Sequence, residues 1–411
     1  MSGGTRQVVT TAIFVVTYLL IAWPQMRALP VGRPAAALIG AVVMVAVGAL
    51  APEAAYDAID GNTLVLLVAL MALSSFLEQA GLFERLTERA CRTRLSPTAL
   101  LDALVFVAGG LSALLLNDTV CLFLTPVVCS VCVRRGLPLG PYLLALATSS
   151  NIGSAATLVG NPQNILIGSL GPLDFAGYAR IVAPAALAGL AANALLLRLA
   201  FGRALRASPG ARVDSPAADT RLQPAPLVIA LVVAVGYALG FHLAFTTLVG
   251  VAALIARGRS EPRAMFAAID WPLIVFFAAL FVVVAAFAST GFPEAAWRIA
   301  APHLVLAEPR GVAWLTAYTL IGSNLFSNVP LVMLTGPLLH ALDSPVRAFA
   351  LLGFVSTVAG NLTLLGSVAN LIVAERARQH HELGFVEYLR FGVLSTLVVL
   401  AVGVPIVCLL T

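Results

Sequence analysis

Two apolar segments of this chain, residues 140–168 and 350–374, are each long enough to cross a membrane but are interrupted at the centre by small and polar residues. The first interruption reads SSNIGSAATLVGNPQN from residue 149, and the second reads TVAGNLTLLGSVAN from residue 357. When the two are aligned, the polar positions coincide 206 residues apart: Thr157, Gly160 and Asn164 fall on Thr363, Gly366 and Asn370. Paired broken segments in corresponding halves of a membrane protein point to the binding site of a transporter.

The composition places these segments in a helical protein that crosses the membrane many times. The chain is 60% hydrophobic and 10% charged, with a mean hydropathy of +0.98. Apolar runs of 18 to 20 residues recur along its length, which is the signature of transmembrane helices. We expect an all-α fold with about ten transmembrane helices, near residues 8–26, 34–51, 63–79, 140–168, 176–200, 226–242, 243–257, 271–289, 350–374 and 388–410.

Two further apolar stretches, 98–134 and 312–341, carry a polar interruption at the centre, and we interpret them as re-entrant hairpins. Irregular backbone is not tolerated against lipid, so the hairpin tips must be buried in protein or line a wet cavity. All 24 basic residues are arginine. If each hairpin enters and leaves on the same side of the membrane, 19 of these arginines fall on one side. The positive-inside rule makes that side cytoplasmic.

The two halves match outside the broken segments as well. Asp60 and Asp270 each open a span and look like helix N-caps, and Gly81 and Gly291 follow at the same spacing. The arginine distribution gives the halves opposite orientations, so we expect an inverted-topology repeat with a site near the bilayer midplane. The predicted parts are N-terminal scaffold helices (1–59), a first repeat (60–202), a linker with scaffold helices (203–269) and a second repeat (270–411).

The hairpin tips carry the residues that suit chemistry with ions. The first tip contains Asn117, Asp118 and Thr119, and the second contains Ser327 and Asn328. Where a helix breaks inside a membrane, free N–H groups and a partial positive charge suit an anion, and free carbonyls suit a cation. The pattern predicts a pocket for an anion and a small cation, formed where a hairpin tip faces a broken helix.

Other interpretations of these residues stay open. Polar side chains in membrane helices also bond across helices and stabilise packing. Asp118 is a candidate to bind a proton or sodium ion, or it caps free N–H groups at the tip. No arginine is expected in the pocket, so a bidentate clamp for a carboxylate is not predicted. No ATP-binding motif or catalytic constellation occurs, so we do not expect an enzyme.

At these motifs the chain resembles the ion transporter superfamily with the citrate-transporter-like domain, which includes arsenite permeases, divalent-anion/sodium symporters and sodium/proton antiporters. The resemblance covers residues 30–410, and the Asn-Asp tip is closest to the arsenite-permease branch. It implies two cation sites that could hold Na⁺: Ser112, Asn117 and Gly153 in one, and Ser323, Asn328 and Gly360 in the other. We add Asp118 as a further ion-binding residue, because it is a carboxylate at membrane depth. The resemblance places the substrate among Asn117, Thr119, Asn328, Asn361 and Thr363, and we add Asn164 and Asn370.

The function expected from these observations is secondary active transport of a small anion, an inorganic oxyanion, an arsenite-like species or a carboxylate, driven by a sodium or proton gradient. The alternative is a sodium/proton antiporter that uses Asp118 as the exchanging carboxylate. We expect no cofactor other than a coupling Na⁺ and no nucleic-acid partner. The expected partners are the lipid bilayer, the small anion and, from the resemblance, a second copy in a homodimer. The expected location is the inner membrane of a bacterium, with several passes.

Overall fold

The computed structural model describes residues 3–22, 32–208, 222–258 and 262–411. Within these ranges every regular element is a helix. Most of the polar segment 203–225 and the end of the first expected span lie outside the described residues. The N-terminal and central helices are α1 (Gly3–Ala22), α2 (Arg33–Ala46), α3 (Pro52–Asp57), α11 (Pro224–Ala238), α12 (Leu243–Arg257) and α13 (Pro262–Ala267).

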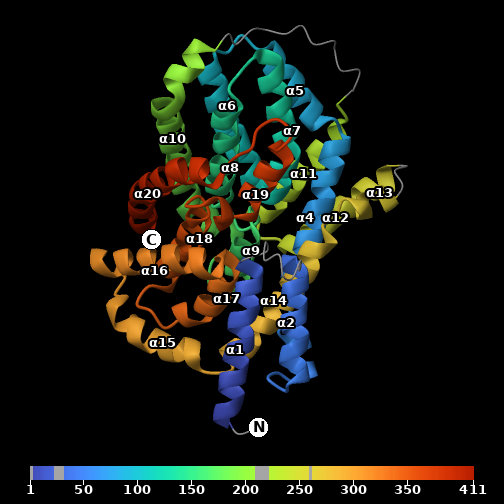
Figure 1. The fold of residues 1–411 in the computed structure, drawn as a ribbon. Coiled ribbons are helices and arrows are strands. Elements are labelled where there is room, and N and C mark those ends of the chain that lie inside the picture. Colours follow the sequence, from blue (N-terminus) through green and yellow to red (C-terminus); the bar gives the residue numbers. More distant parts are fainter. Residues whose placement is uncertain (1–2, 23–31, 209–221, 259–261) are drawn as a thin grey trace.

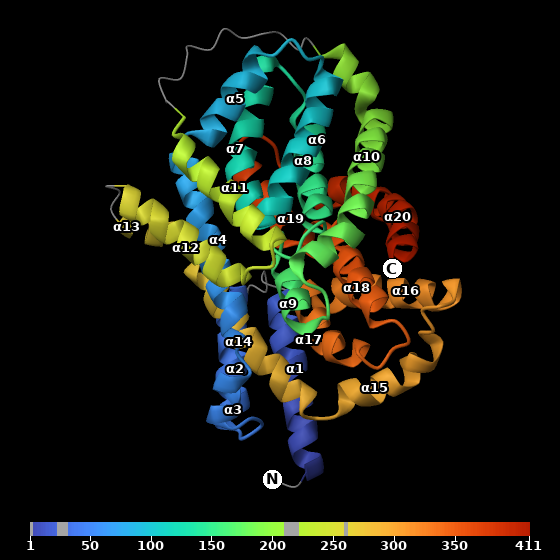
Figure 2. The ribbon, with the colours of Figure 1, turned by 180° about the vertical axis from the view of Figure 1, so that it is seen from behind.

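The remaining helices occur in the same order twice, and the two sets point in opposite directions. Helix α4 (Gly61–Gln79) opens the first set and ends beside α5 (Leu82–Arg92) at the top of Figures 1 and 2. Helix α14 (Trp271–Ala288) opens the second set and ends beside α15 (Phe292–Ala300) at the bottom. The first set is α4 (Gly61–Gln79), α5 (Leu82–Arg92), α6 (Pro97–Leu114), α7 (Asn117–Arg135), α8 (Leu139–Ser154), α9 (Pro162–Leu170) and α10 (Phe175–Ala207). The second is α14 (Trp271–Ala288), α15 (Phe292–Ala300), α16 (Pro309–Phe326), α17 (Asn328–Leu339), α18 (Pro345–Ala359), α19 (Val368–Ala377) and α20 (Phe385–Leu410).

The opening helices of the two sets begin and end with the same local chemistry. The Asp60 carboxylate accepts hydrogen bonds from the backbone of Asn62 and Thr63, and that of Asp270 accepts one from Leu273. Each carboxylate therefore satisfies N–H groups that a helix start leaves free. Gly81 and Gly291 have φ values of 82° and 75°, a left-handed conformation that glycine adopts without strain. The predicted N-caps and the internal repeat are both confirmed.

The hairpins and broken helices lie where the sequence predicts them. Helices α6 and α7 are joined by Leu115 and Leu116, and α16 and α17 are joined by Ser327. Helix α8 ends at Ser154 and α9 begins at Pro162, so the segment between them is not helical. The second break, between α18 and α19, contains only the short 3₁₀ turn η2 (Leu364–Gly366). The four breaks meet near the centre of the molecule, between the two oppositely directed sets (Figure 1).

Length and composition agree with a protein that crosses the membrane. Among the described residues, seven helices are long and apolar enough to span a bilayer. Both arms of the first hairpin are among them, although a two-residue turn joins these arms next to the broken helices. Shorter apolar helices include α2, α11, α12, α17 and α18. Large apolar side chains are exposed on the outer helices, for example Leu199 on α10, Phe245 on α12 and Leu409 on α20, which suits contact with lipid.

Close packing of helices α6 and α8 sets the position of the first hairpin relative to the first broken helix. A Cβ atom added to Gly153 on α8 would lie 2.2 Å from the carbonyl oxygen of Gly109 on α6. Only glycine allows this approach, and small residues at such contacts are typical of membrane helix pairs. The tip of the hairpin is thereby held against the start of the break that follows α8.

Candidate functional site

The candidate site is a small cavity, about 60 Å³ in volume, at which the N-termini of four helices converge. Two of the helices, α7 and α17, are the second arms of the hairpins, and the other two, α9 and α19, are the second halves of the broken helices. A helix N-terminus presents free N–H groups and a partial positive charge, which together attract an anion. The lining also includes Phe276 and Phe277 of α14.

The polar lining of the cavity comes from the hairpin tips and the breaks. Asn117 and Asp118 reach it from α7, and Ser327 and Asn328 reach it from the start of α17. Asn328 is 9% exposed, and its side-chain oxygen has no hydrogen-bond partner. Gln163 at the start of α9 and Ser367 just before α19 complete the polar lining. The two hairpin tips, predicted to face one site, therefore line the same cavity.

One expectation about the lining was wrong, because an arginine does lie in it. Arg33, the first residue of α2, lines the cavity together with the hairpin tips. Its side chain is half-buried and forms no ion pair with any carboxylate in the described part of the chain. Arg33 is one of the 19 arginines that the sequence places on the cytoplasmic side. The sequence alone does not show that α2 begins next to the cavity.

Asn151, near the end of α8, connects the two repeats. Its side-chain nitrogen donates to the side-chain oxygens of Asn361 (2.9 Å) and Asn370 (3.0 Å) in the second break. Its side-chain oxygen accepts from Asn117 at the first hairpin tip and from Ser367 in the second break, each at 3.0 Å. Both N–H groups and both lone pairs of this buried amide are therefore used by polar residues around the cavity.

Thr357 on α18 stands at the corresponding position in the second repeat and makes the reverse connection. Its hydroxyl accepts from the side-chain nitrogens of Asn161 (3.1 Å) and Gln163 (3.3 Å) in the first break. It lies 3.3 Å from the side-chain oxygen of Asn164, to which it donates. Sequence reasoning did not select Asn151, Thr357, Asn161, Gln163 or Ser367 as site residues. The signal that could have found them is that Asn151 and Thr357 share the 206-residue spacing.

Asn164 and Asn370, which the sequence places in the substrate site, are directed at backbone carbonyls. The Asn164 side-chain nitrogen donates to the carbonyls of Ser154, Ala155 and Thr157 at 3.3, 3.4 and 3.0 Å. That of Asn370 donates to the carbonyls of Gly360 (2.8 Å) and Thr363 (3.1 Å). In each repeat this asparagine satisfies carbonyls that the broken helix leaves free. Neither side chain lines the cavity.

The residues proposed for two cation sites differ between the repeats. The Ser112 hydroxyl is 2.8 Å from that of Ser150, so it already has a partner. The corresponding Ser323 hydroxyl is buried and has none. The side-chain oxygens of Asn117 and Asn328 both lack a partner, so the repeats differ at the serine and not at the asparagine. Free oxygens next to an unwound helix suit a sodium ion, so the chemistry fits at the second hairpin, where Ser323 and Asn328 would hold it.

The other predicted residues lie around the cavity without lining it. Asn361 is fully buried, and its side-chain nitrogen donates to the carbonyl of Thr148 at 3.1 Å. Thr363 contributes its carbonyl to Asn370. Thr119 is half-buried in the first turn of α7. Gly153 packs on α6, and Gly360 ends α18 with its carbonyl bonded to Asn370.

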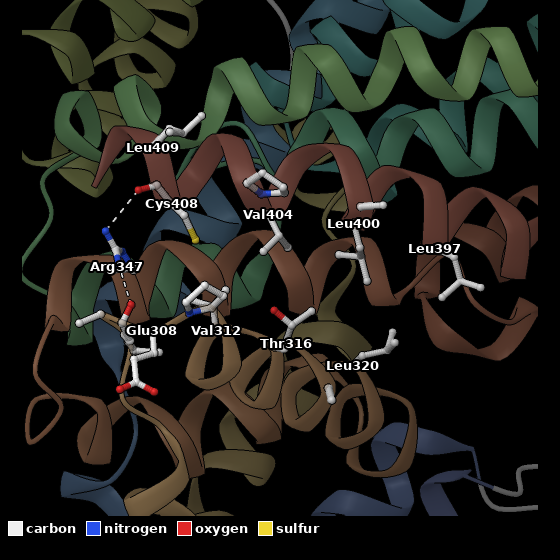
Figure 3. A pocket seen from close by; sticks show the side chains of 17 residues that line it. Glu308, Val312, Thr316, Leu320, Arg347, Leu397, Leu400, Val404, Cys408 and Leu409 are labelled. Atoms are coloured by element: carbon white, nitrogen blue, oxygen red, sulfur yellow. Dashed lines mark hydrogen bonds between the residues drawn. The ribbon is translucent and has the colours of Figure 1, made fainter.

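A larger groove, about 770 Å³ in volume, lies between α16 and α20 (Figure 3). Most of its lining is aliphatic, and the Arg347 guanidinium at one end is already bonded to neutral acceptors. It donates to the carbonyls of Leu306 (2.6 Å) and Cys408 (3.2 Å) and to the hydroxyl of Thr411 (3.0 Å). The groove offers few polar groups to orient a small ion, whereas the smaller cavity is ringed by them.

Comparison with known proteins agrees with this architecture. A model of the citrate transporter family (CitMHS) matches residues 18–348. The silicon efflux transporter LSI3 of Oryza sativa subsp. japonica is 33% identical over 98% of each chain. The arsB protein of Dictyostelium discoideum, named as a transporter, is 29% identical over 100% of this chain and 94% of its own. The inner membrane protein YbiR of Escherichia coli is 32% identical over 80% of this chain and 82% of its own.

Among solved structures, the YdaH transporter of Alcanivorax borkumensis, described as having an unusual topology, has the same fold with a TM-score of 0.52. The match covers 97% of this chain and 98% of the other at 17% identity, so it speaks for the fold alone. The family match covers both hairpins and the first broken helix, which build part of the cavity, whereas the second break lies beyond the matched residues. The chain therefore belongs to the citrate transporter (CitMHS) family and is a multi-pass membrane transporter.

Proposed function

We propose that this protein is a secondary active transporter that moves a small oxyacid anion across the membrane through the cavity at the hairpin tips. The observation that carries the proposal is the convergence of four helix N-termini with Arg33 on one cavity. Against these positive groups the lining contains a single carboxylate, that of Asp118. The balance favours a bound anion.

The size of the cavity favours a small inorganic species over a tricarboxylate. Its volume of about 60 Å³ corresponds to room for roughly four to six water molecules, at about 10–15 Å³ for each. An oxyacid with four or five heavy atoms fits this space, whereas citrate does not fit without a rearrangement of the hairpins. The rice relative named as a silicon efflux transporter supports an inorganic substrate.

The inverted repeat supports alternating access as the mechanism. The hairpins reach one cavity from different sides, the first from the top of Figure 1 and the second from the lower left, so each can open the site to its own side. We propose a sodium or proton gradient as the energy source, with Na⁺ at Ser323 and Asn328 or a proton at Asp118. We also propose a bacterial inner-membrane location and a homodimer, as the resemblance implies.

A second candidate function, sodium/proton antiport without an anion, is favoured by one observation, the position of Asp118 in the cavity lining. Under that function, Asp118→Asn abolishes proton movement that depends on sodium, and no anion is transported. Fluorescent pH measurements in vesicles distinguish the two functions.

The test of the main proposal is transport by purified protein in liposomes. Silicate, arsenite and citrate are supplied in turn, with an imposed sodium or proton gradient and with no gradient as the control. We expect uptake or efflux of an inorganic oxyacid that depends on one gradient, and little movement of citrate. The proposal fails if no anion moves under either gradient, or if Asn117→Ala and Asn328→Ala both transport at the normal rate.

A further inference from the structure

The cavity consists of two halves that correspond to each other through the internal repeat. In one half the N-terminus of α7 lies beside that of α19, and in the other the N-terminus of α17 lies beside that of α9. Position 118 on α7 corresponds to position 329 on α17, at the 211-residue spacing of the hairpins. Position 369 on α19 corresponds to position 163 on α9, at the 206-residue spacing of the broken helices.

The first half already contains an anion that belongs to the protein. The Asp118 carboxylate lies in the first turn of α7 and lines the cavity together with Ser367 and Val368 at the start of α19. One carboxylate therefore interacts with the positive ends of two helices, as acidic residues do at helix starts. This half has no need of an anion from solution.

The second half has the same helix ends without the carboxylate. Val329 stands at the position that corresponds to Asp118, and neither α9 nor α17 has an acidic residue in its first turn. The side chain of Asn328, more than nine-tenths buried, lines the cavity here. In the described structure it makes no hydrogen bond, so its amide N–H groups are free to donate, whereas the amide of Asn117 in the first half already donates to Asn151. Arg33, which has no acidic partner in the described structure, adds a full positive charge to the same cavity.

We propose that Asp118 fills one of two equivalent anion positions and that the transported anion fills the other, between the N-termini of α9 and α17. The anion accepts hydrogen bonds from the backbone N–H of Gln163, in the first turn of α9, and from the side-chain amide of Asn328. This assignment rests on the proposed function and narrows its substrate to a small anion with a single negative charge. A second negative charge would face Asp118 across a cavity of about 60 Å³.

The direct test is to place a carboxylate in the second half, with Val329→Asp, and to compare it with Val329→Asn, which has almost the same shape without the charge. Binding to purified protein is measured by calorimetry with nitrate, formate and perchlorate as monovalent probes and sulfate and succinate as divalent probes. We expect the unmodified protein to bind a monovalent probe in preference to the divalent ones. Val329→Asp should weaken that binding on the order of 100-fold, because like charges placed together cost several kcal/mol. Val329→Asn should change it by only a few-fold.

The converse variant, Asp118→Asn, keeps the test decisive if Val329→Asp does not fold. Removal of the carboxylate leaves both halves positive, so we expect this variant to bind sulfate at least about tenfold more tightly than the unmodified protein does. Unchanged selectivity between monovalent and divalent probes in Asp118→Asn would overturn the assignment. Normal monovalent binding by a folded Val329→Asp would overturn it as well.

These outcomes separate the inference from the proposed function. If liposomes show gradient-driven anion transport but the two variants leave charge selectivity unchanged, the assignment of the two halves is wrong and the transport function stands. If the unmodified protein binds none of the probes and moves no anion, both the function and the inference are wrong.

Discussion

Asn151 and Thr357 make reciprocal connections: the side chain of each is hydrogen-bonded to the broken segment of the other repeat. Asn151 contacts Asn361 and Asn370 of the second break, and Thr357 contacts Asn161 and Asn164 of the first. The two broken segments are thus joined by side-chain hydrogen bonds that run in both directions between the repeats. The amide of Asn151 also accepts from Asn117, so it joins the first hairpin tip to residues of the second repeat.

The reciprocal connection predicts that Thr357→Val destabilises the protein. The change leaves the buried amides of Asn161, Gln163 and Asn164 short of a partner, which costs about 1–3 kcal/mol. Thr396→Val is the matched control, because the Thr396 hydroxyl on α20 is equally buried and has no hydrogen-bond partner. Thermal unfolding in detergent should show a lower melting temperature for Thr357→Val only. Equal melting temperatures would mean that the connection contributes nothing to stability.

A second prediction concerns the contact between α6 and α8. In Gly153→Ala the new methyl group meets the Gly109 backbone at 2.2 Å, and backbone cannot move aside as a flexible side chain does. We expect a cost of at least about 1–3 kcal/mol and poor yield of folded protein. Gly110→Ala is the control, since a Cβ there has no atom within 4 Å. Size-exclusion profiles of the two variants, expressed side by side, measure the difference. A monodisperse Gly153→Ala with normal yield contradicts the prediction.

The loop between α17 and α18 predicts a pH effect outside the membrane helices. Burial tends to raise the pKa of Asp343, but backbone N–H groups of Leu306 and Ala307, each at 3.0 Å, outweigh it and lower the pKa. A carboxyl with a lowered pKa stabilises the fold above its unfolded value, near 3.9, and that contribution is lost as the pH falls through the folded pKa. Asp343→Asn should therefore lower the melting temperature at pH 7 and less at pH 3. Asp57→Asn removes an exposed carboxylate and serves as the control for the loss of a surface charge at the same pH values.

Much of the fold was predictable because its signals are local. Helix caps at Asp60 and Asp270, the glycines at 81 and 291, and the polar interruptions of apolar runs all depend on a few neighbouring residues. Their recurrence at a constant spacing revealed the repeat. The structure confirms the hairpins and breaks to within a few residues: α12 covers residues 243–257, as predicted, and the second hairpin covers 309–339 where 312–341 was predicted.

The site was harder to predict because its chemistry depends on which elements meet. Nothing near Arg33 in the sequence indicates that α2 begins against two hairpin tips far along the chain. Likewise, Asn164 and Asn370 were recognised as a pair by spacing, but spacing does not show whether an amide faces a cavity or a backbone carbonyl. The three-dimensional arrangement separates Asn117 and Asn328, which line the cavity, from these two, which cap the broken helices.

The hairpin tips give the most specific prediction about transport, because Asn117 and Asn328 occupy corresponding positions with different surroundings. Asn117 donates to Asn151 at 3.0 Å, whereas the described structure shows no hydrogen bond for the Asn328 side chain. Asn328→Ala should therefore raise the KM for the anion, by roughly tenfold for the loss of one hydrogen bond to a charged group, and leave the melting temperature unchanged. Asn117→Ala should lower the melting temperature as well, because it removes a partner of the buried Asn151. Uptake into liposomes and thermal unfolding, measured on the same preparations, check the two effects. A loss of stability in Asn328→Ala equal to that in Asn117→Ala would show that the second tip is structural and not a contact of the substrate.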